Sequence, residues 1–256
     1  MRTIRIYSAE TLTTGSQLEL PESAARHIVQ VLRMSAGGEL VLFDGSGVEY
    51  PGTIVAASKT RVSVQLGMAA QPAVESVIHI SLWHSLCRGD RMDTVVQKAT
   101  ELGASEIQPV ITERGLLRLD SKRAARKLDH WRSIAISACE QSGRVRIPVV
   151  HPIASLDECL QMHRTRQTSP VTALMCDPDG ATGLRSLLHP GPGIIALTGP
   201  EGGFSGDEKA AATDAGFTLV SLGPRILRTE TAPTVVLSIV QSVLGDLEAR
   251  PATTVE

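Results

Sequence analysis

Hydrophobic and polar positions follow two different patterns along this chain of 256 residues. In the first 70 residues, short runs of β-branched residues alternate with turn-forming segments and predict strands at Gly38–Phe43, Tyr50–Ala57 and Arg61–Met68. One helix is predicted among them, Ser23–Met34, because its apolar residues recur at helical spacing. The first part of the chain is therefore expected to form a small β-rich domain.

After a small, polar, proline-containing segment, Ala69–Ser76, predicted strands and helices alternate strictly. The predicted strands are Val77–Leu82, Ile107–Ile111, Pro148–Ile153, Thr172–Met175, Ile194–Thr198 and Thr218–Leu222. The predicted helices are Arg91–Leu102, Ser121–Gln141, Ser155–Met162, Gly183–Leu188, Ser205–Ala215 and Thr231–Leu247. This alternation predicts an α/β domain with a mostly parallel sheet. We therefore expect a small domain over residues 1–70, a linker over 71–76, the α/β domain over 77–250 and a flexible tail over 251–256.

Composition places the chain among globular proteins, with 42% hydrophobic and 20% charged residues. No apolar run approaches the roughly 18 residues of a membrane span, and the N-terminus lacks a signal-peptide stretch. The four cysteines are scattered singly and are expected to be buried free thiols. We expect a soluble cytoplasmic protein without a structural metal or a membrane partner.

The net charge of −2 by itself argues against a nucleic-acid partner, but the charge is unevenly distributed. Residues 1–72, 73–150 and 151–256 carry net charges of 0, +3 and −5. A protein can present a basic face on an acidic background, so nucleic acid is not excluded.

Two segments that follow predicted strands are unusual, and ligands of parallel α/β sheets bind at such loops. The first reads LTGPEGGFS (Leu197–Ser205) and contains three glycines, which let other groups approach the backbone closely. It matches neither a dinucleotide-binding fingerprint nor a phosphate-binding P-loop. The second reads LGPRILRTETAP (Leu222–Pro233) and combines two arginines, an acid and two aliphatic residues, with Thr229 or Thr231 as a helix cap. An ion pair at a helix start is the plainer interpretation, but this mixture favours a functional loop.

These two loops together resemble the SPOUT, or trefoil-knotted, methyltransferases, and more narrowly their ribosomal small-subunit uridine-N3 methyltransferase family. Further matching segments are HIVQVLRM (27–34), LFDGSG (42–47), RGDRMD (88–93), QKATELG (97–103) and ACEQSGR (138–144). The resemblance implies an N-terminal PUA-like β-barrel that binds RNA, a C-terminal knotted α/β domain and a homodimer. It also implies methylation of N3 of a uridine in 16S rRNA, on the assembled small ribosomal subunit, with S-adenosylmethionine (SAM) as cofactor.

By the family pattern, the cofactor contacts fall on Leu197, Gly199, Gly203, Leu222, Gly223, Ile226, Leu227, Arg228 and Ala232. The rest of the first loop, Thr198, Pro200, Glu201 and Gly202, together with Thr231, completes the predicted cofactor site.

Methyl transfer from a sulfonium is an in-line displacement that needs alignment and exclusion of water rather than a metal or a covalent intermediate. Uridine N3 carries a proton at neutral pH, so the site must accept that proton or stabilise the anion. We hypothesise that Arg228 or Arg225 stabilises the anion. Glu230 would orient an arginine or accept the proton, and Glu201 is the other candidate acceptor.

RNA contacts are expected from basic side chains that recognise shape. The candidates are Arg2, Arg5, Arg26, Arg33, Lys59, Arg61, Arg88, Arg91 and Arg144. The basic run Arg114–Arg132 is more typical of a solvated helix face. Two other interpretations stay open: another SPOUT activity, on a tRNA ribose 2′-O or guanine N1, and a non-catalytic RNA-binding assembly factor.

Overall fold

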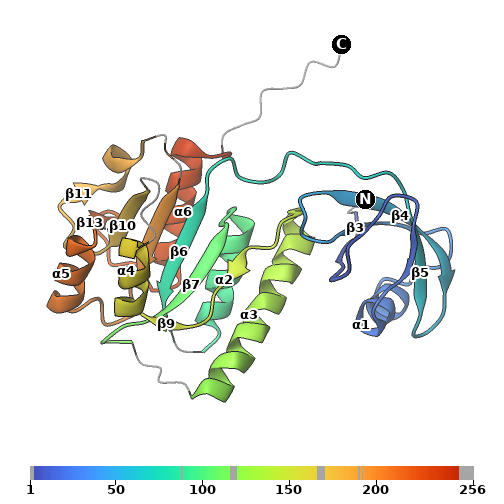
Figure 1. Cartoon of the computed structure of the whole chain (residues 1–256), viewed down its shortest axis with the longest axis horizontal. Helices are drawn as coiled ribbons and strands as arrows, with labels where there is room; N and C mark the ends of the chain where they lie inside the picture. The colour runs from blue at the N-terminus through green and yellow to red at the C-terminus, as the bar shows by residue number, and fades with distance from the viewer. Residues whose placement is uncertain are drawn as a thin grey trace, which may run out of the picture. The chain divides into compact units, whose positions relative to one another are not determined.

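The computed structural model describes residues 3–87, 89–115, 120–165, 171–189, 191 and 193–247 (Figure 1). The predictions for Arg2, Arg88 and the tail 251–256 lie outside these residues. The chain divides into two compact units. The N-terminal unit comprises Met1–Glu75 and Ile136–Ile147, and the large unit comprises Ser76–Ala135 and Pro148–Glu256.

A five-stranded mixed sheet forms the N-terminal unit. Its strands are β1 (Arg5–Tyr7), β2 (Gln17–Glu19), β3 (Glu39–Phe43), β4 (Glu49–Ala57) and β5 (Val62–Leu66). They lie in the order β1-β3-β4-β5-β2, in which β1 and β3 are parallel and the other pairs are antiparallel. Along β5 buried and half-buried residues alternate, which is the period-2 pattern that predicted a strand here.

One helical segment packs on this sheet, and it is shorter than predicted. The α-helix α1 (Glu22–Arg26) continues as the π-helix η1 (His27–Val31) and ends there rather than at Met34. Ala25 and Ile28 are fully buried in the core of the unit. The widened π turn shifts the later side chains around the helix axis, so a uniform 3.6-residue pattern does not describe this segment.

Residues 136–147 join the N-terminal unit although they lie far from it in the sequence. They include the end of helix α3 (Ser121–Ser142) and the loop after it. Cys139 and Val145 are buried against Phe43, with Tyr7 and Val74 beside them. No hydrophobic period in the sequence predicts this grouping, because it depends on tertiary contacts alone.

A parallel sheet forms the centre of the large unit. Its strands are β6 (Ile80–Ser85), β7 (Glu106–Ile111), β8 (Val149–Val150), β9 (Ala154–Ser155), β10 (Thr172–Cys176), β11 (Thr182–Gly183), β12 (Ile194–Thr198) and β13 (Thr218–Ser221). The order is β11-β13-β10-β12-β6-β7-β8, with β9 paired to β7. The pairings described are parallel, as the alternating pattern predicted.

Helices cover both faces of this sheet (Figure 1). They are α2 (Arg91–Glu101), α4 (Leu156–Thr165), α5 (Gly206–Asp214) and α6 (Thr231–Leu244). Helices α4 and α5 contribute Leu160 and Ala212 to an apolar cluster with Trp83 and Leu197 of the sheet. Helix α6 packs on α2 and on β12. A capping box between Ser205 and Glu208 begins α5, and Ser155 makes the same pair of contacts with Glu158 before α4.

Two strands and one short helix of the large unit differ from their predictions. The strand predicted at Val77–Leu82 runs over Ile80–Ser85, because this interior strand buries its polar residues too and hides the pattern. Only Val149–Val150 of the strand predicted at Pro148–Ile153 is paired, since the prolines at its flanks have no N–H to donate. The short helix predicted at Gly183–Leu188 is the 3₁₀ turn η2, Leu184–Leu187.

The last helix is shorter than predicted. It ends at Leu244 rather than at Leu247, which is 52% exposed. Leu237 and Gln241 are buried, whereas Val235 and Ile239 are half-buried. Gln241 is tolerated inside because its amide donates to Leu102 O and its carbonyl accepts a hydrogen bond from Ser76.

Candidate functional site at the carboxyl edge of the sheet

Three neighbouring strands of the large unit end at the same level. Cys176, the last residue of β10, is paired with Thr198 at the end of β12 and with Val220 near the end of β13. The loops that follow these three strands therefore start side by side at the carboxyl edge of the sheet. This is the place where ligands of parallel α/β sheets bind.

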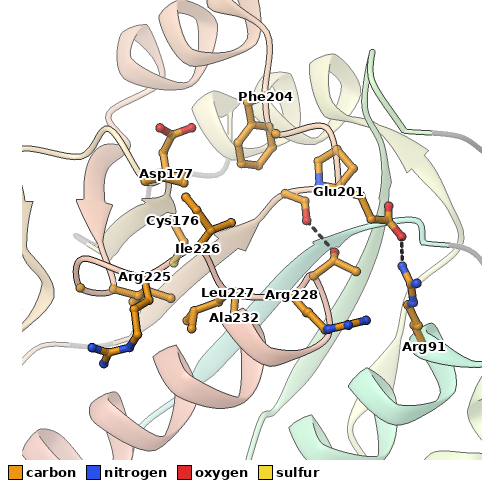
Figure 2. A pocket seen from close by; sticks show the side chains of 17 residues that line it. Arg91, Cys176, Asp177, Glu201, Phe204, Arg225, Ile226, Leu227, Arg228 and Ala232 are labelled. Atoms are coloured by element: carbon orange, nitrogen blue, oxygen red, sulfur yellow. Dashed lines mark hydrogen bonds and ion pairs between the residues drawn. The ribbon is translucent and has the colours of Figure 1, made fainter.

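A cavity of about 390 Å³ lies between these loops (Figure 2). That volume falls in the usual range for small-molecule sites. Most of the predicted cofactor residues line it, namely Gly199, Pro200, Glu201, Gly203, Leu222, Gly223, Ile226, Leu227, Arg228 and Ala232. The two loops singled out in the sequence thus share one cavity.

Four predicted cofactor residues are not among the residues that line the cavity. Leu197 is buried in the apolar cluster under α4 and α5. Thr198 is buried as well, and its Oγ1 lies 2.7 Å from His84 Nδ1. Gly202 uses its carbonyl oxygen to accept a hydrogen bond from Arg114, and Thr231 is the first residue of α6.

The glycine loop (Gly199–Phe204) is held at both ends. At its start, Thr229 Oγ1 donates a 2.9 Å hydrogen bond to Gly199 O and joins the two loops. A Cβ at Gly199 would lie 2.9 Å from the Phe204 ring, so this position requires glycine. Gly203 adopts a φ of +66°, in the left-handed region. The capping box of Ser205 then anchors the end of the loop.

The middle of the second loop (Leu222–Glu230) is exposed, and the loop leads directly into α6. Gly223 has a φ of +111°, and Ile226 is 80% exposed. Thr231 N and Ala232 N donate to Arg228 O, which begins the helix. The predicted cap by Thr229 or Thr231 is wrong: Glu230 occupies the cap position without a side-chain hydrogen bond, because Thr229 is turned toward Gly199.

Charged side chains gather on one side of the cavity. The Arg91 guanidinium forms an ion pair with Glu201, and its Nε lies 3.9 Å from Glu230 Oε2. Arg228 lies on the same side as this pair, whereas Arg225 lies on the opposite side of the cavity (Figure 2). Of the predicted catalytic residues, Arg225, Arg228 and Glu201 line the cavity, and Glu230 reaches the group through Arg91.

Sequence reasoning missed the third wall of the cavity, which the loop after β10 provides. This wall consists of Cys176, Asp177 and Pro178. Phe204 of the glycine loop also lines the cavity. Lys209 of α5 holds this wall in place, because its Nζ lies 2.9 Å from Asp177 Oδ1 and 3.1 Å from Asp179 Oδ2. The turn sequence DPDG after a strand was the available indication, but only the strand order brings it between the other two loops.

Burial keeps two titratable groups of the sheet, His84 and Cys176, neutral. Burial lowers the pKa of His84 to about 3, so this imidazole carries no charge at physiological pH. Burial raises the pKa of the Cys176 thiol to about 12, with a smaller contribution from Asp177. The four cysteines are buried free thiols, as predicted. A thiolate nucleophile is therefore not part of this site.

The candidate RNA contacts fall into separate groups. Arg5 and Arg144 lie largely buried in ion pairs with Glu49 and Glu75. Arg26 and Arg61 form exposed pairs, and Arg91 belongs to the cavity. Arg33 and Lys59 are exposed at the surface.

Two negative findings concern only the part of the chain that the structure describes. None of its helices is both long and apolar enough to cross a membrane. Its His, Cys, Asp and Glu side chains form no group of three or more that could hold a metal ion.

Comparison with known proteins gives a consistent result over nearly the whole chain. A family model described as an RNA methyltransferase domain matches residues 74–241, and one described as an RNA methyltransferase PUA domain matches residues 20–67. The chain is 33% identical to ribosomal RNA small subunit methyltransferase E of Bacillus subtilis, over 84% of this chain and 85% of that protein.

Solved structures agree with this result. A ribosomal RNA small subunit methyltransferase E from Neisseria gonorrhoeae, bound to SAM, is 38% identical, with a TM-score of 0.89 over 96% of this chain and all of that one. A putative methyltransferase from Legionella pneumophila, in complex with SAM, is 37% identical, with the same TM-score and coverage.

Proposed function

The chain belongs to the RNA methyltransferase family with an N-terminal PUA domain, and we propose that it transfers the methyl group of SAM to N3 of a uridine in 16S rRNA. The observation that carries this proposal is the single cavity formed by the glycine loop and the second loop. The names of its relatives support the small-subunit rRNA as substrate, and their structures support SAM as cofactor. The trefoil knot that the resemblance implies stays a prediction.

The residues of the cavity fit SAM. Its lining combines apolar side chains, such as Leu222 and Leu227, with backbone from the glycine loop and the buried Asp177 carboxylate. The aromatic base of SAM can pack on the apolar side chains. Its hydroxyl and amino groups can donate hydrogen bonds to backbone carbonyls of the glycine loop and to the Asp177 carboxylate. Bound SAM supplies an electrophilic methyl group, and no further cofactor chemistry is needed. Glycines with positive φ let the backbone follow the ligand closely.

The protein's own contribution is alignment and charge. The loops exclude water around the reacting atoms and hold the uracil in line with the methyl group. As N3 loses its proton, negative charge spreads to the neighbouring carbonyl oxygens. Arg228 lines the cavity and is exposed, so its guanidinium can stabilise that charge. A carboxylate, Glu230 or Glu201, accepts the proton or orients the arginine.

We also propose that the protein works as a homodimer on the assembled small subunit, in the cytoplasm. Support for a dimer comes from the half-exposed apolar residues of α6, Val235, Ile239 and Val243, and from the exposed Ile226. Apolar surface of this kind is typical of a protein interface. Light scattering of the purified chain tests it, with a mass of twice 27.2 kDa expected.

Nucleoside mass spectrometry tests the proposed activity. Small ribosomal subunits that lack the modification are incubated with the purified protein and SAM, and 3-methyluridine is expected. Another methylated nucleoside, formed in tRNA, would replace this proposal by the other SPOUT activities. SAM binding without methylation of either RNA would point to a different RNA target, and absence of both would favour the assembly factor.

A further inference from the structure

Arg91 occupies a position from which it reaches both loops of the cavity. It is the first residue of α2 and its side chain is half-buried. Its Nη1 donates to Glu201 Oε1 in the glycine loop, and its Nε lies 3.9 Å from Glu230 Oε2 in the second loop. A single guanidinium from a third element thus faces one carboxylate from each loop, as Figure 2 shows for Glu201.

Glu230 depends on this arginine for its charge balance. Among the described residues, Glu230 Oε2 is buried and accepts no hydrogen bond, so the nearby guanidinium is its compensating group. The same three charges also act on the buried Cys87 thiol. Burial is the main cause of its raised pKa, Glu201 and Glu230 raise it further, and Arg91 lowers it. Arg91, Glu201 and Glu230 therefore form one electrostatic cluster with a net charge of −1.

Loss of the arginine would remove the cation that pairs with one carboxylate from each loop. In the described structure, one direct hydrogen bond joins the two loops, from Thr229 Oγ1 to Gly199 O, and Thr229 directly precedes Glu230. Without Arg91, this is the one direct hydrogen bond described between the loops that would oppose repulsion between Glu201 and Glu230. The loops would separate on the side of the cavity where Arg228 lies.

We propose that Arg91 is a positioning residue that holds the glycine loop and the second loop at the separation that the cofactor requires. This differs from the RNA contact expected from its charge alone, because its guanidinium faces two carboxylates rather than free solvent. The inference rests on the proposed function, since the cofactor of that function is SAM. It predicts that Arg91 acts on SAM affinity even when no RNA is present.

The test is SAM binding by calorimetry to the full-length protein without RNA. Arg91→Met should weaken binding about fivefold or more, and R91K, which keeps the charge, should weaken it less than about twofold. E201Q should weaken binding as well, and the R91M/E201Q double variant should be no weaker than R91M alone, because both changes break the same contact. Lys98→Met is the matched control: Lys98 lies on the same helix, pairs locally with Glu101 and should leave binding unchanged.

Hydrogen exchange provides a readout that does not need the cofactor. In R91M the amides of residues 199–204 and 223–230 should exchange faster than in the wild type and in K98M, with the rest of the large unit unchanged. Equal SAM binding and equal exchange in R91M and the wild type would overturn the inference, and a loss of RNA affinity alone would make Arg91 an RNA contact. If the wild type binds no SAM, the proposed function fails, while the exchange measurement still decides the role of Arg91.

Discussion

The two units differ in the polar side chains that their sheets bury. The N-terminal unit buries ion pairs: Arg144 is 7% exposed and bonds Glu75 through Nε and Nη2, and Arg5 pairs with Glu49. The central strands of the large unit bury neutral groups instead. His84 bonds Thr198, and Ser85 Oγ lies 2.6 Å from Thr112 Oγ1.

This difference distinguishes arginines that stabilise the fold from arginines that can bind a substrate. A buried arginine in an ion pair is shielded from a phosphate by the surrounding protein, so we assign Arg5 and Arg144 to the fold. In the large unit no arginine described beside the cavity is fully buried, and Arg225 and Arg228 remain exposed there. Basic residues of equal appearance in the sequence therefore have different roles in the two units.

Breaking the best-buried pair should have the largest effect. Arg144→Met leaves the Glu75 carboxylate in the interior, held by the N–H groups of Val145 and Arg146 but without its cation. We expect the free energy of unfolding of the N-terminal unit to fall by about 3–5 kcal/mol. Hydrogen exchange of residues 3–75 and 136–147 measures it. Arg26→Met, in an exposed pair with Glu22, is the control and should cost less than about 1 kcal/mol. An equal loss in both variants would contradict the distinction drawn here.

Low pH should destabilise the large unit through the buried His84 imidazole. Its pKa is about 3 in the folded protein, whereas the unfolded chain binds a proton near pH 6.5. Stability is therefore fully present above pH 6.5 and is lost progressively as the pH falls toward 3, at up to about 1.4 kcal/mol per pH unit. Urea unfolding followed by the fluorescence of Trp83, on the same strand, measures this slope. His84→Gln should flatten it, while replacement of the exposed His189 should leave it as in the wild type.

Hydrophobic patterning was sufficient for most elements and insufficient for strand β6, which lies inside the sheet. The bounds of helix α5 were predicted to within a residue or two, because Ser205 and Glu208 form a capping box at its start and Gly216 follows its end. Strand β6 was misplaced because all six of its residues are buried, polar ones included, so no alternation marks its bounds. The grouping of residues 136–147 with the N-terminal unit has no local pattern at all.

The site shows the same division between local and tertiary information. The glycine loop and the second loop are recognisable in the sequence, because their glycines and charged residues are concentrated in short segments. The wall formed by Asp177 and held by Lys209 was not, since it exists only because β10 lies between β12 and β13. The roles of Arg5, Arg91 and Arg144 likewise depend on carboxylates that are distant in the sequence.

An exposed arginine of the cavity should affect rate rather than stability, which sharpens the comparison with Arg144. We expect Arg228→Met to lower the methylation rate at saturating SAM and RNA about tenfold or more, because it removes a donor for the developing anion. Its thermal stability should change by less than about 0.5 kcal/mol. Arg225→Met, on the opposite side of the cavity, should lower the single-turnover rate much less. If R225M methylates as slowly as R228M, Arg225 also stabilises the anion, and the proposed difference between the two arginines is wrong.

The smallest expected effect concerns an arginine that the backbone disfavours. Arg33 has a φ of +54°, and within the described residues it is the one non-glycine position with a positive φ. It follows η1, where Leu32 N donates to His27 O and Met34 N donates to Ile28 O, a helix end at which glycine is the usual residue. Arg33→Gly should therefore stabilise the protein by about 0.5–1 kcal/mol.

If Arg33 contacts RNA, the same substitution should weaken RNA binding, so stability and affinity move in opposite directions. Arg33→Ala removes the same charge but keeps the backbone cost, and it should bind RNA as weakly as R33G while melting at a lower temperature. Filter binding to the small subunit and thermal denaturation of both variants measure the two quantities. Higher stability together with weaker RNA binding in R33G would distinguish Arg33 from Arg5 and Arg144, because loss of either of these two arginines is expected to lower stability. Unchanged RNA binding in both variants would remove Arg33 from the interface and leave the RNA contacts of this unit to other exposed residues, such as Lys59.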